Sequence, residues 1–594
     1  MNSLSISNKS WILKKYNPDD VMFFKENYSL DEITSKLLSI RNIKKDEVES
    51  FLNPSIKNFL PNPYIISDME KSSKKVSEVI FKNLKIGIFG DYDVDGASAT
   101  ALLGNYFTAL GLNYMTYIPD RKKEGYGPSI EAFRYFIDNK IKLIFTVDCG
   151  TLSFEAIEYA KKNKIDVVVL DHHQSEINLP NAHSIVNPNR FDDKSDLKYL
   201  CAAGVTFMFL VALNKELRLV NWFKNKNIVE PNLIEYLDLV TLGTVCDVVP
   251  LIGLNRAIVA QGLKILKTKR NLGLKTLLNI CGIETHPNIY HVGYLLGPRI
   301  NAGGRVGKSS HGANLLLNNN PKEVFKIATE LDQFNKERQF LEKDVLDKIQ
   351  KEIKIDVSEP VIIISGKNWH EGVIGIVAAR IKDKFNKPVI IISIENDIGK
   401  ASARSIVGFD IGSVIIAATQ ENILMKGGGH KMAGGFTIKV NQIDKFKKFI
   451  FKKFEKINQY LTKQKPLYFD SVIAPTAINL EFYNKVNTLA PFGSGNPEPK
   501  FVIENLKTVS HKVLKDKHIK SILVGADGSS FKTIAFNSVD NEIGAYLLKK
   551  DNKLFNIVGK LSLNEWRGQS NVEFIIDDIS VNKTFKKMVP SSIG

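Results

Sequence analysis

The feature that most constrains the fold is a regular alternation of strand-like and helix-like segments in the first half of the chain. Strand-like runs at 84–90, 112–119, 141–147 and 165–170 alternate with helix-like segments at 97–110, 128–139 and 153–163. Strands that alternate with helices of this length predict a parallel sheet covered by helices on both faces. In such sheets ligands bind beyond the carboxyl ends of the strands, so the residues after each strand form the candidate site.

Acidic residues and histidines follow three of these four strands. They are Asp91, Asp93 and Asp95 after the first strand, Asp148 after the third, and Asp171, His172 and His173 after the fourth. A single acidic residue in this place often caps the next helix, and for Asp91 we weigh a cap and an indirect role beside a metal equally. Several carboxylates packed together without a cation would repel one another and raise one another's pKa. Oxygen ligands with one or two imidazoles suit Mn²⁺ or Mg²⁺, so the sequence predicts one or two divalent ions and metal-assisted phosphoester hydrolysis.

The remainder of the chain predicts three further parts. Residues 205–282 are mostly helical, with an interruption at 241–251, and 321–353 has the pattern of one long helix that bridges two lobes. A second, smaller α/β domain is indicated by strands at 360–365 and 388–393, helices at 371–385, 411–421 and 441–460, and a glycine-rich turn at 427–429. From Pro466 onward, short alternating runs are typical of a small closed β-barrel.

The predicted organisation therefore has six segments. They are an N-terminal segment at 1–65, the parallel-sheet domain at 66–320, the connecting helix at 321–355, the smaller α/β domain at 356–460, the barrel at 461–582 and a tail at 583–594.

Composition narrows the class of protein without deciding it. The chain has 81 Lys and Arg against 64 Asp and Glu, a net charge of +17 and a pI near 9.3. A polyanionic partner such as nucleic acid and a biased genome composition explain this charge equally well. Four distant cysteines argue against a disulfide framework, and no apolar run is long enough to span a membrane. We see no signal peptide at the N-terminus and therefore expect a cytoplasmic protein.

Four short motifs resemble those of the DHH phosphoesterase family. They are GDYDVDG (90–96), TVDCG (146–150), LDHH (170–173) and GTVCDVVPL (243–251). Further blocks resemble the bacterial exonucleases of this family that act on single strands: GPRINAGGR (297–305), WHEGVIGIVAAR (369–380), ASARS (401–405), GGGHKMAGG (427–435) and PFGSGNPEP (491–499). The resemblance extends from about residue 50 to 580. It implies a DHH domain, a bridging helix, a smaller α/β DHHA1 domain and a barrel of the OB type.

The resemblance also implies the metal ligands. Asp93, Asp95, His172 and Asp247 would bind the ions, and Asp148 would be shared by both. His173 would lie beside the cluster, either near the scissile phosphate or behind a ligand. Many relatives place a histidine four residues before the first ligand, where this chain has Phe89; Asp91 or a water is the candidate replacement.

The nucleic-acid contacts implied by the resemblance come from the later blocks. Ser402, Arg404 and Arg305 would form a pocket for a terminal 5′-phosphate, and His430 would contact substrate phosphate. We expect His370 to be structural or to line the cleft rather than to act in catalysis. The further candidate contacts are Arg299 and Asn301, and in the barrel Lys512, Lys515, Lys517, Lys520, Trp566 and Arg567. Asn301-Ala302-Gly303 replaces the family's asparagine-alanine-alanine, a small change that we expect to be harmless.

The expected activity is a 5′→3′ exonuclease on single-stranded DNA that releases mononucleotides and serves repair and recombination. The family implies a single-strand-binding protein and a RecQ-type helicase as partners, and we expect a monomer. One alternative is a related enzyme acting on short oligonucleotides, cyclic dinucleotides or pyrophosphate. Another is a nucleic-acid-binding protein that has lost its metals. The retention of all five ligands argues against this alternative.

Overall fold

The computed structural model of the protein describes residues 5–581 except 122, 285, 354, 459–464, 550–552 and 567–568. The chain forms two compact units. One unit combines residues 1–61, 248–261 and 462–594, and the other combines residues 62–247 and 262–461. The N-terminal residues join the C-terminal ones because β1 (Lys9–Leu13) pairs in parallel with β12 (Lys465–Phe469).

The larger unit contains the predicted parallel sheet. Its strands follow the order β3-β2-β4-β5-β6, and every pair in it is parallel. The strands are β2 (Ile86–Gly90), β3 (Tyr114–Tyr117), β4 (Leu143–Val147), β5 (Asp166–Leu170) and β6 (Ser184–Val186). The four predicted strands are confirmed. The sequence analysis missed β6 because a strand of three residues leaves almost no periodic signal.

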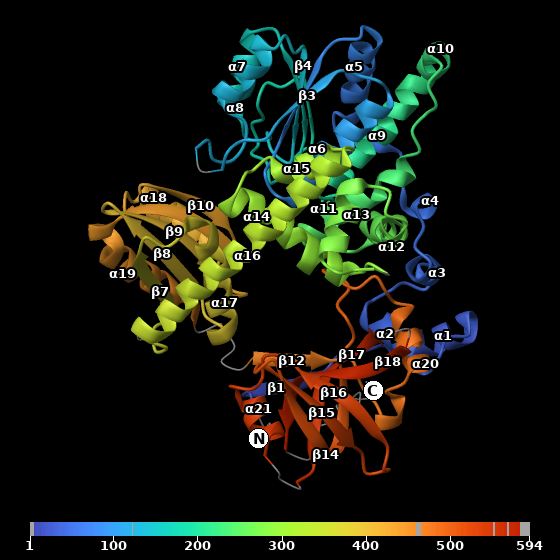
Figure 1. The fold of residues 1–594 in the computed structure, drawn as a ribbon, viewed down its shortest axis with the longest axis vertical. Coiled ribbons are helices and arrows are strands. Elements are labelled where there is room, and N and C mark those ends of the chain that lie inside the picture. Colours follow the sequence, from blue (N-terminus) through green and yellow to red (C-terminus); the bar gives the residue numbers. More distant parts are fainter. Residues whose placement is uncertain are drawn as a thin grey trace, which may run out of the picture. The chain divides into compact units, whose positions relative to one another are not determined.

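Helices cover both faces of this sheet (Figure 1). One face is covered by α7 (Ile130–Asp138) and α8 (Phe154–Lys162), whose apolar side chains share a core with the strands. The other face is covered by α5 (Met69–Phe81), α6 (Val94–Ala109) and α9 (Ala202–Leu219). The predicted interruption of the helices at 241–251 is wrong in its position. Helix α11 (Leu237–Cys246) packs against α6 and α9 and continues through Cys246, so the interruption begins only at Asp247.

A long helix connects this domain to the second sheet. As predicted, α16 (Pro321–Glu352) is one continuous helix, capped by Asn320, and it contacts both α14 (Gly297–Val306) and α17 (Glu371–Phe385). The elements that lead to it are α12 (Gly253–Thr268), α13 (Leu272–Ile280), the π-helix η3 (His291–Leu296), α14 (Gly297–Val306) and α15 (His311–Leu317). Three further short helices are α3 (Val48–Leu52), α4 (Ile56–Phe59) and α10 (Trp222–Lys226).

The second sheet is mixed, with the order β10-β11-β9-β8-β7. Its elements are β7 (Ile362–Lys367), α17 (Glu371–Phe385), β8 (Val389–Glu395), β9 (Ile398–Arg404), α18 (Ile411–Gln420), β10 (Lys426–His430), β11 (Ala433–Lys439) and α19 (Ile443–Asn458). The glycines predicted to form a turn lie instead in β10. Gly427 of β10 and Gly434 of β11 allow α18 to approach, because a Cβ on Gly427 would lie 2.7 Å from Ile415 and one on Gly434 would lie 2.5 Å from it.

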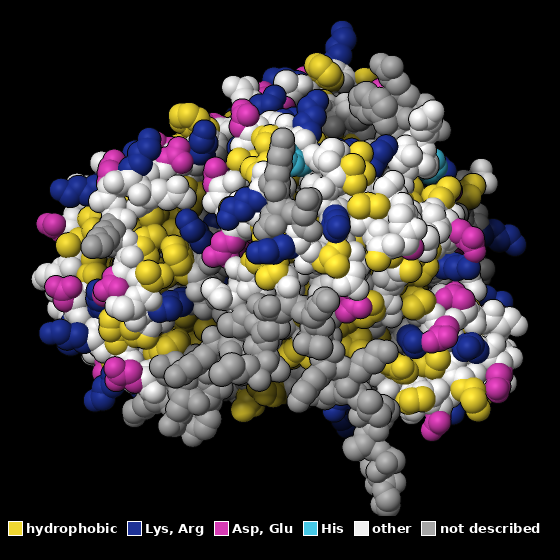
Figure 2. All heavy atoms as spheres, turned by 90° about the horizontal axis from the view of Figure 1, so that it is seen from below, with side chains coloured by type: hydrophobic (Ala, Val, Ile, Leu, Met, Phe, Trp, Pro, Cys, Tyr) yellow, Lys and Arg dark blue, Asp and Glu magenta, His cyan; other side chains and the backbone are white. Residues whose placement is uncertain are grey.

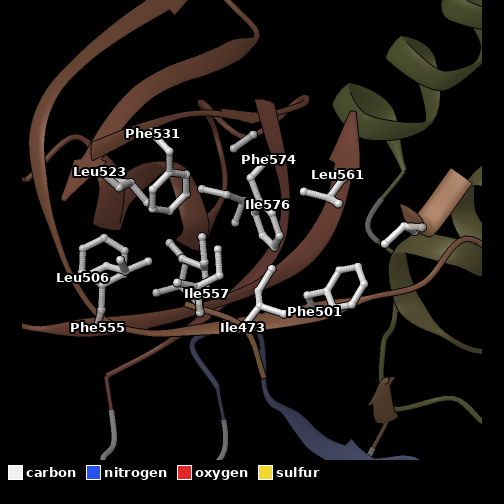
Figure 3. Packing of buried hydrophobic residues seen from close by; sticks show 14 of the residues in the cluster. Ile473, Phe501, Leu506, Leu523, Phe531, Phe555, Ile557, Leu561, Phe574 and Ile576 are labelled. Carbon is white, nitrogen blue, oxygen red and sulfur yellow. The ribbon is translucent and has the colours of Figure 1, made fainter. Parts of the chain in front are cut away.

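The predicted barrel is present in the smaller unit. Its strands are β14 (Phe501–Leu514), β15 (His518–Val524), β16 (Ser530–Ala535), β17 (Phe555–Trp566) and β18 (Gln569–Ser580), with β13 (Ser471–Val472) beside β14. The pairing of β14 with β17 closes the barrel. Figure 3 shows apolar side chains such as Phe531, Ile557 and Phe574 directed toward one another inside it. The helices α1 (Pro18–Tyr28), α2 (Glu32–Ile40), α20 (Leu480–Asn487) and α21 (Glu542–Leu547) extend the same core.

A buried arginine joins three separate segments of the smaller unit. The guanidinium of Arg256, only 1% exposed, stacks 3.8 Å from the ring centroid of Phe51 and donates to that residue's carbonyl oxygen. It also donates to the carbonyl oxygens of Leu489, Ala490 and Pro491 at 2.8 to 3.2 Å. Burial, together with the nearby charge of Arg41, lowers the pKa of Arg256 to about 10, so the guanidinium is still charged at neutral pH.

We predict that Arg256→Ala lowers the free energy of unfolding of the smaller unit by about 3 kcal/mol, since it leaves several buried carbonyl groups unpaired. Thermal unfolding followed by circular dichroism measures this change. The matched control is Arg134→Ala, which removes an exposed arginine of α7. Equal unfolding temperatures for the two variants would contradict the assignment.

Candidate metal and phosphate site

Three carboxylates follow β2 at the carboxyl edge of the parallel sheet. Asp91 is buried directly after the strand, and Asp93 caps α6. Asp95 lies in the first turn of α6 and accepts hydrogen bonds from the amides of Ala202 and Ala203 at 2.6 and 3.0 Å. Those amides open α9, so the ends of two helices, which favour negative charge, hold these carboxylates in place.

His172 lies among carboxylates from three different segments. Its Nε2 atom is 3.3 Å from Asp148 Oδ1 and 3.8 Å from Asp95 Oδ2, and its Nδ1 atom is 3.7 Å from Asp247 Oδ2. Asp148 has a φ of +62°, a left-handed conformation that residues other than glycine rarely adopt. Backbone strain of this kind concentrates at functional sites.

The ligand atoms form three overlapping groups that could each hold an ion. Within each group the atoms lie within 4.8 Å of one another. The groups are Asp95, His172 and Asp247; Asp91, Asp93 and Asp148; and Asp148, His172 and His173. The sequence prediction that Asp93, Asp95, Asp148, His172 and Asp247 converge is thus matched by their positions, and Asp91 joins them.

The electrostatics of these carboxylates indicate a site that requires positive charge. Burial, together with neighbouring carboxylates, raises the pKa of Asp91 and of Asp247 to about 8 and raises that of Asp148 well above its usual value. The buried Oδ1 atoms of Asp91 and Asp148 accept no hydrogen bond from the described residues. Oxygen donors with imidazole suit Mn²⁺ and Mg²⁺, so the residues present fit divalent ions.

The side chains of Asp171 and Tyr126 hold His173 in position. Asp171 Oδ1 lies 2.8 Å from His173 Nδ1, and the opposite oxygen of Asp171 accepts from the amide of Thr151. Burial alone would raise the pKa of Asp171 and lower that of His173. Their interaction outweighs burial, so the pKa of Asp171 is lowered and that of His173 is raised to about 9. The Tyr126 hydroxyl lies 3.2 Å from His173 Nδ1 and donates to the carbonyl oxygen of Asp148.

Two asparagines after β6 complete the support, and the sequence analysis missed both. Asn187 Nδ2 donates to the carbonyl oxygen of His173 at 2.8 Å, and Asn189 Nδ2 donates to that of His172 at 2.6 Å. Both asparagines follow a short apolar run. The rule that identified the acidic residues, which looks for polar residues after a strand, applies to them as well. Tyr126, from the loop before α7, had no comparable signal.

Phe89 stands apart from the site. It is fully buried in β2, and its ring stacks on Tyr117 with centroids 5.8 Å apart and packs edge-on against Phe133. The position where many relatives have a histidine therefore belongs to the apolar core. The oxygen of Asp91, two residues later, lies within the ligand group of Asp93 and Asp148.

An arginine and a serine of β9 lie beside α17. Ser402 and Arg404 alternate along the strand and so share one face, where Arg404 Nη1 donates to Ser402 Oγ at 3.3 Å. A Cβ on Gly375 of α17 would lie 2.9 Å from Ser402 Oγ and 3.0 Å from Arg404 Nη2. Only a glycine at this position lets the helix pack so closely against both side chains.

Arg305, near the end of α14, lies against the first turn of α17. Its Nη1 atom donates to the carbonyl oxygen of Gly372 in the first turn of α17. Burial and the nearby charges of Arg121, Arg338 and Arg404 lower its pKa to about 10, while Asp93 acts in the opposite direction. Arginines crowded against a helix N-terminus are suited to binding phosphate. His370 caps this helix by accepting from the Gly372 amide, in agreement with its expected structural role.

The other predicted nucleic-acid residues occupy varied positions. Arg299 is tied to α16 by an ion pair between its Nε atom and Asp332 Oδ1 at 2.9 Å. Asn301 is half-buried in α14, and His430 is exposed at the end of β10. Trp566 ends β17, but its side chain is outside the described part of the structure.

The barrel lysines are mostly solvent-exposed. Lys512, Lys515 and Lys517 are exposed around the β14–β15 hairpin, whereas Lys520 pairs with Glu573 at 2.6 Å. Arg567 lies outside the described residues. Figure 2 shows Lys and Arg side chains dispersed among acidic and apolar ones over the visible face. On this face, the distribution of charge alone does not identify a binding surface.

Family models match three regions of the chain. The DHH family N-terminal domain matches residues 85–244, the DHHA1 domain matches 358–456 and the RecJ OB domain matches 469–578. The "Single-stranded-DNA-specific exonuclease RecJ" of Bacillus subtilis is 31% identical over 97% of this chain and 71% of its own length. The protein of the same name from Escherichia coli is 34% identical over 89% of this chain and 92% of its own length.

Solved structures agree with these relatives. The structure of Thermus thermophilus RecJ in complex with Mn²⁺ is similar with a TM-score of 0.79 and 25% identity, covering 97% of this chain and 80% of that one. The Mg²⁺ complex of the same protein has a TM-score of 0.73 and 24% identity, with coverage of 97% and 79%.

The fold and the acidic site thus define a metal-dependent phosphoesterase of the DHH class. Within this class, the chain belongs to the family of the single-stranded-DNA-specific exonuclease RecJ.

We predict that Asp148→Asn stabilises the metal-free protein, on the order of 1 kcal/mol, because it removes a buried carboxyl group whose ionisation is opposed by burial and by the neighbouring carboxylates. Mn²⁺ should raise the unfolding temperature of the wild type and leave that of the variant nearly unchanged. Differential scanning fluorimetry with and without Mn²⁺ measures both effects, with the exposed Asp138→Asn as control. An equal response of wild type and Asp148→Asn to Mn²⁺ would refute the assignment.

The stabilisation by Mn²⁺ should also depend on pH. The pKa values of Asp91 and Asp247 are about 8 in the folded protein and about 4 when unfolded. Without metal, these groups destabilise the fold increasingly as the pH rises between those values, because the unfolded chain loses its protons first. The increase in unfolding temperature with Mn²⁺ should therefore be larger at pH 8 than at pH 6. A larger increase at pH 6 would contradict this account.

Proposed function

We propose that this protein is a 5′→3′ exonuclease that hydrolyses single-stranded DNA to 5′-mononucleotides with two divalent ions. The observation that carries the proposal is the position of α14 between the acidic cluster and the arginine group. Arg305 of this helix is affected electrostatically by both Asp93 and Arg404. A Cβ on Gly304, the preceding residue, would lie 3.1 Å from Tyr92, which separates the first two carboxylates.

The proposed ligands divide into two sets around a shared carboxylate. Asp95, His172 and Asp247 would hold one ion, and Asp91 and Asp93 the other, with Asp148 contributing to both. Manganese and magnesium ions, when bound, lower the pKa of a coordinated water and neutralise charge on the scissile phosphate. The participation of Asp91 replaces the histidine that this chain lacks at Phe89.

Side chains around the ligands would orient the substrate. His173 is fixed between Asp171 and Tyr126, from where its ring can hydrogen-bond a phosphate oxygen. Asn187 and Asn189 hold the backbone carbonyls of the two histidines, which keeps both rings in place without direct contact to substrate.

The arginine group would determine the polarity of digestion. We propose that Arg305, Ser402 and Arg404 bind the terminal 5′-phosphate, assisted by the N-terminus of α17. A strand held by this end presents a fixed phosphodiester to the ions, so cleavage proceeds from the 5′ end. We further propose Arg299, Asn301, His430 and Trp566 as contacts along the strand.

The cellular setting is also part of the proposal. We infer a cytoplasmic monomer that acts in repair and recombination with a single-strand-binding protein and a RecQ-type helicase. None of the helices in the described part of the chain has the length and apolar character that crossing a membrane requires.

We predict that a single strand labelled at its 5′ end releases labelled mononucleotide at once in Mn²⁺ or Mg²⁺, and that a 3′-labelled strand releases its label last. Chelation by EDTA should stop the reaction. Asp148→Ala should abolish cleavage and largely preserve strand binding, because binding does not depend on the ions alone. Equal release from both ends would exclude the proposed polarity.

Replacement of Arg404 should remove the preference for phosphorylated ends. We predict that Arg404→Gln lowers kcat/KM on 5′-phosphorylated strands about 10- to 100-fold, the effect of losing one or two charge-assisted hydrogen bonds. Strands with a 5′-hydroxyl should be cleaved equally by wild type and variant. Arg134→Gln, at an exposed site of α7, is the matched control. An equal loss on both kinds of end would contradict the pocket.

A further inference from the structure

The π-helix η3 is anchored next to a candidate metal ligand. The Cys246 thiol lies 3.6 Å from the carbonyl oxygen of Val292, and a Cβ on Gly293 would lie 3.4 Å from Val245 Cγ1. Cys246 directly precedes Asp247, and η3 continues into α14, which carries Arg305. π-Helical segments are rare and are frequent at functional sites. This segment therefore borders the proposed site without contributing a ligand to it.

Two tyrosines on and beside this segment stack on each other in solvent. The ring centroids of Tyr290 and Tyr294 are 5.2 Å apart with an interplanar angle of 25°. The exposed fractions of Tyr290 and Tyr294 are 59% and 69%. Val292, between the two tyrosines, and Leu296, after them, are buried in the core. The segment is thus amphipathic, with its apolar side chains inward and a flat aromatic face outward. Core packing does not explain why the outward face is aromatic.

We propose that Tyr290 and Tyr294 form a stacking platform for an unpaired base of the substrate strand. The inference rests on the proposed function and adds a base contact to its phosphate contacts. Aromatic side chains at single-strand sites bind bases of any sequence because every base has a π-face. Position favours a nucleic acid as the occupant, since a protein docked beside Asp247 would compete with the substrate.

The platform would contribute to selectivity for single strands. In a duplex each base is stacked on both faces and paired at its edge, so no face is free to meet the tyrosines. An unpaired base can leave its neighbours and exchange one stacking partner for another at little cost. The phosphate contacts of Arg305 and Arg404 carry no such discrimination, because both kinds of strand have phosphates.

The test is strand binding with the Asp148→Ala protein in EDTA, so that neither cleavage nor metal affects the result. The probes are a 5′-phosphorylated single strand with 2-aminopurine near its 5′ end and the same strand with abasic residues there. Loss of one stacked base corresponds to about a 5- to 150-fold change in affinity. We expect Tyr290→Ala and Tyr294→Ala to weaken binding of the first strand within this range and to abolish fluorescence quenching.

Further variants separate stacking from other causes. Tyr290→Phe and Tyr294→Phe should retain affinity and quenching, whereas Tyr294→Leu, apolar but not flat, should lose both. Binding of the abasic strand should be unchanged in every variant. Tyr135→Ala, at a 46% exposed tyrosine of α7, is the control and should behave as the parent protein.

Two results would overturn the proposal. One is unchanged binding of the 2-aminopurine strand by the alanine variants, and the other is an equal loss for the abasic strand. The proposed function fails separately, if wild-type protein with Mn²⁺ does not degrade single strands from the 5′ end. That outcome is measured with labelled ends and is independent of the tyrosine variants.

Discussion

The mutual repulsion of carboxylates at one edge of a sheet is the constraint on which the rest of the structure depends. Five aspartates and two histidines lie close enough to share ions, and four of the carboxylates have raised pKa values because they are buried beside one another. Keeping them together without metal costs free energy, which the surrounding fold must supply. The buried parallel strands, the helix N-termini at Asp93 and Asp95, and the asparagines behind the histidines provide this support.

The opposite charge is concentrated on elements that pack nearby within the same unit. Arg305 lies on α14 and Arg404 on β9, and glycines at 372 and 375 let α17 approach both. Negative carboxylates that attract cations and arginines that attract phosphate are thus held by one framework of packed helices. Under the proposed function, a strand fixed at one end by the arginines and cut at the carboxylates would be degraded in one direction. In this proposal, the polarity of digestion would follow from the fixed positions of the two charged groups.

Local patterns in the sequence predicted most of the fold and the core of the site. The parallel strands, α16 and the barrel have long or strongly periodic signals, and the rule that ligands follow strand ends identified Asp93, Asp148 and His172. The short strand β6 had too few residues for such a signal, and Asn187 and Asn189 were missed with it. The glycines of β10 predict a turn when only the local sequence is considered, because their contact with α18 is tertiary. The ion pair of Arg299 with Asp332 joins residues 33 positions apart and could not be read from either segment.

A crystal structure of the His173→Asn variant with Mn²⁺ and a short 5′-phosphorylated strand tests the central claim most directly, because this variant keeps all six ligands proposed for the two ions. Anomalous scattering locates manganese independently of any assumption about ligands. The account predicts one peak among Asp95, His172 and Asp247, a second among Asp91, Asp93 and Asp148, and the terminal phosphate against Arg404. Peaks elsewhere, or a strand bound with its 3′ end at Arg404, would contradict it.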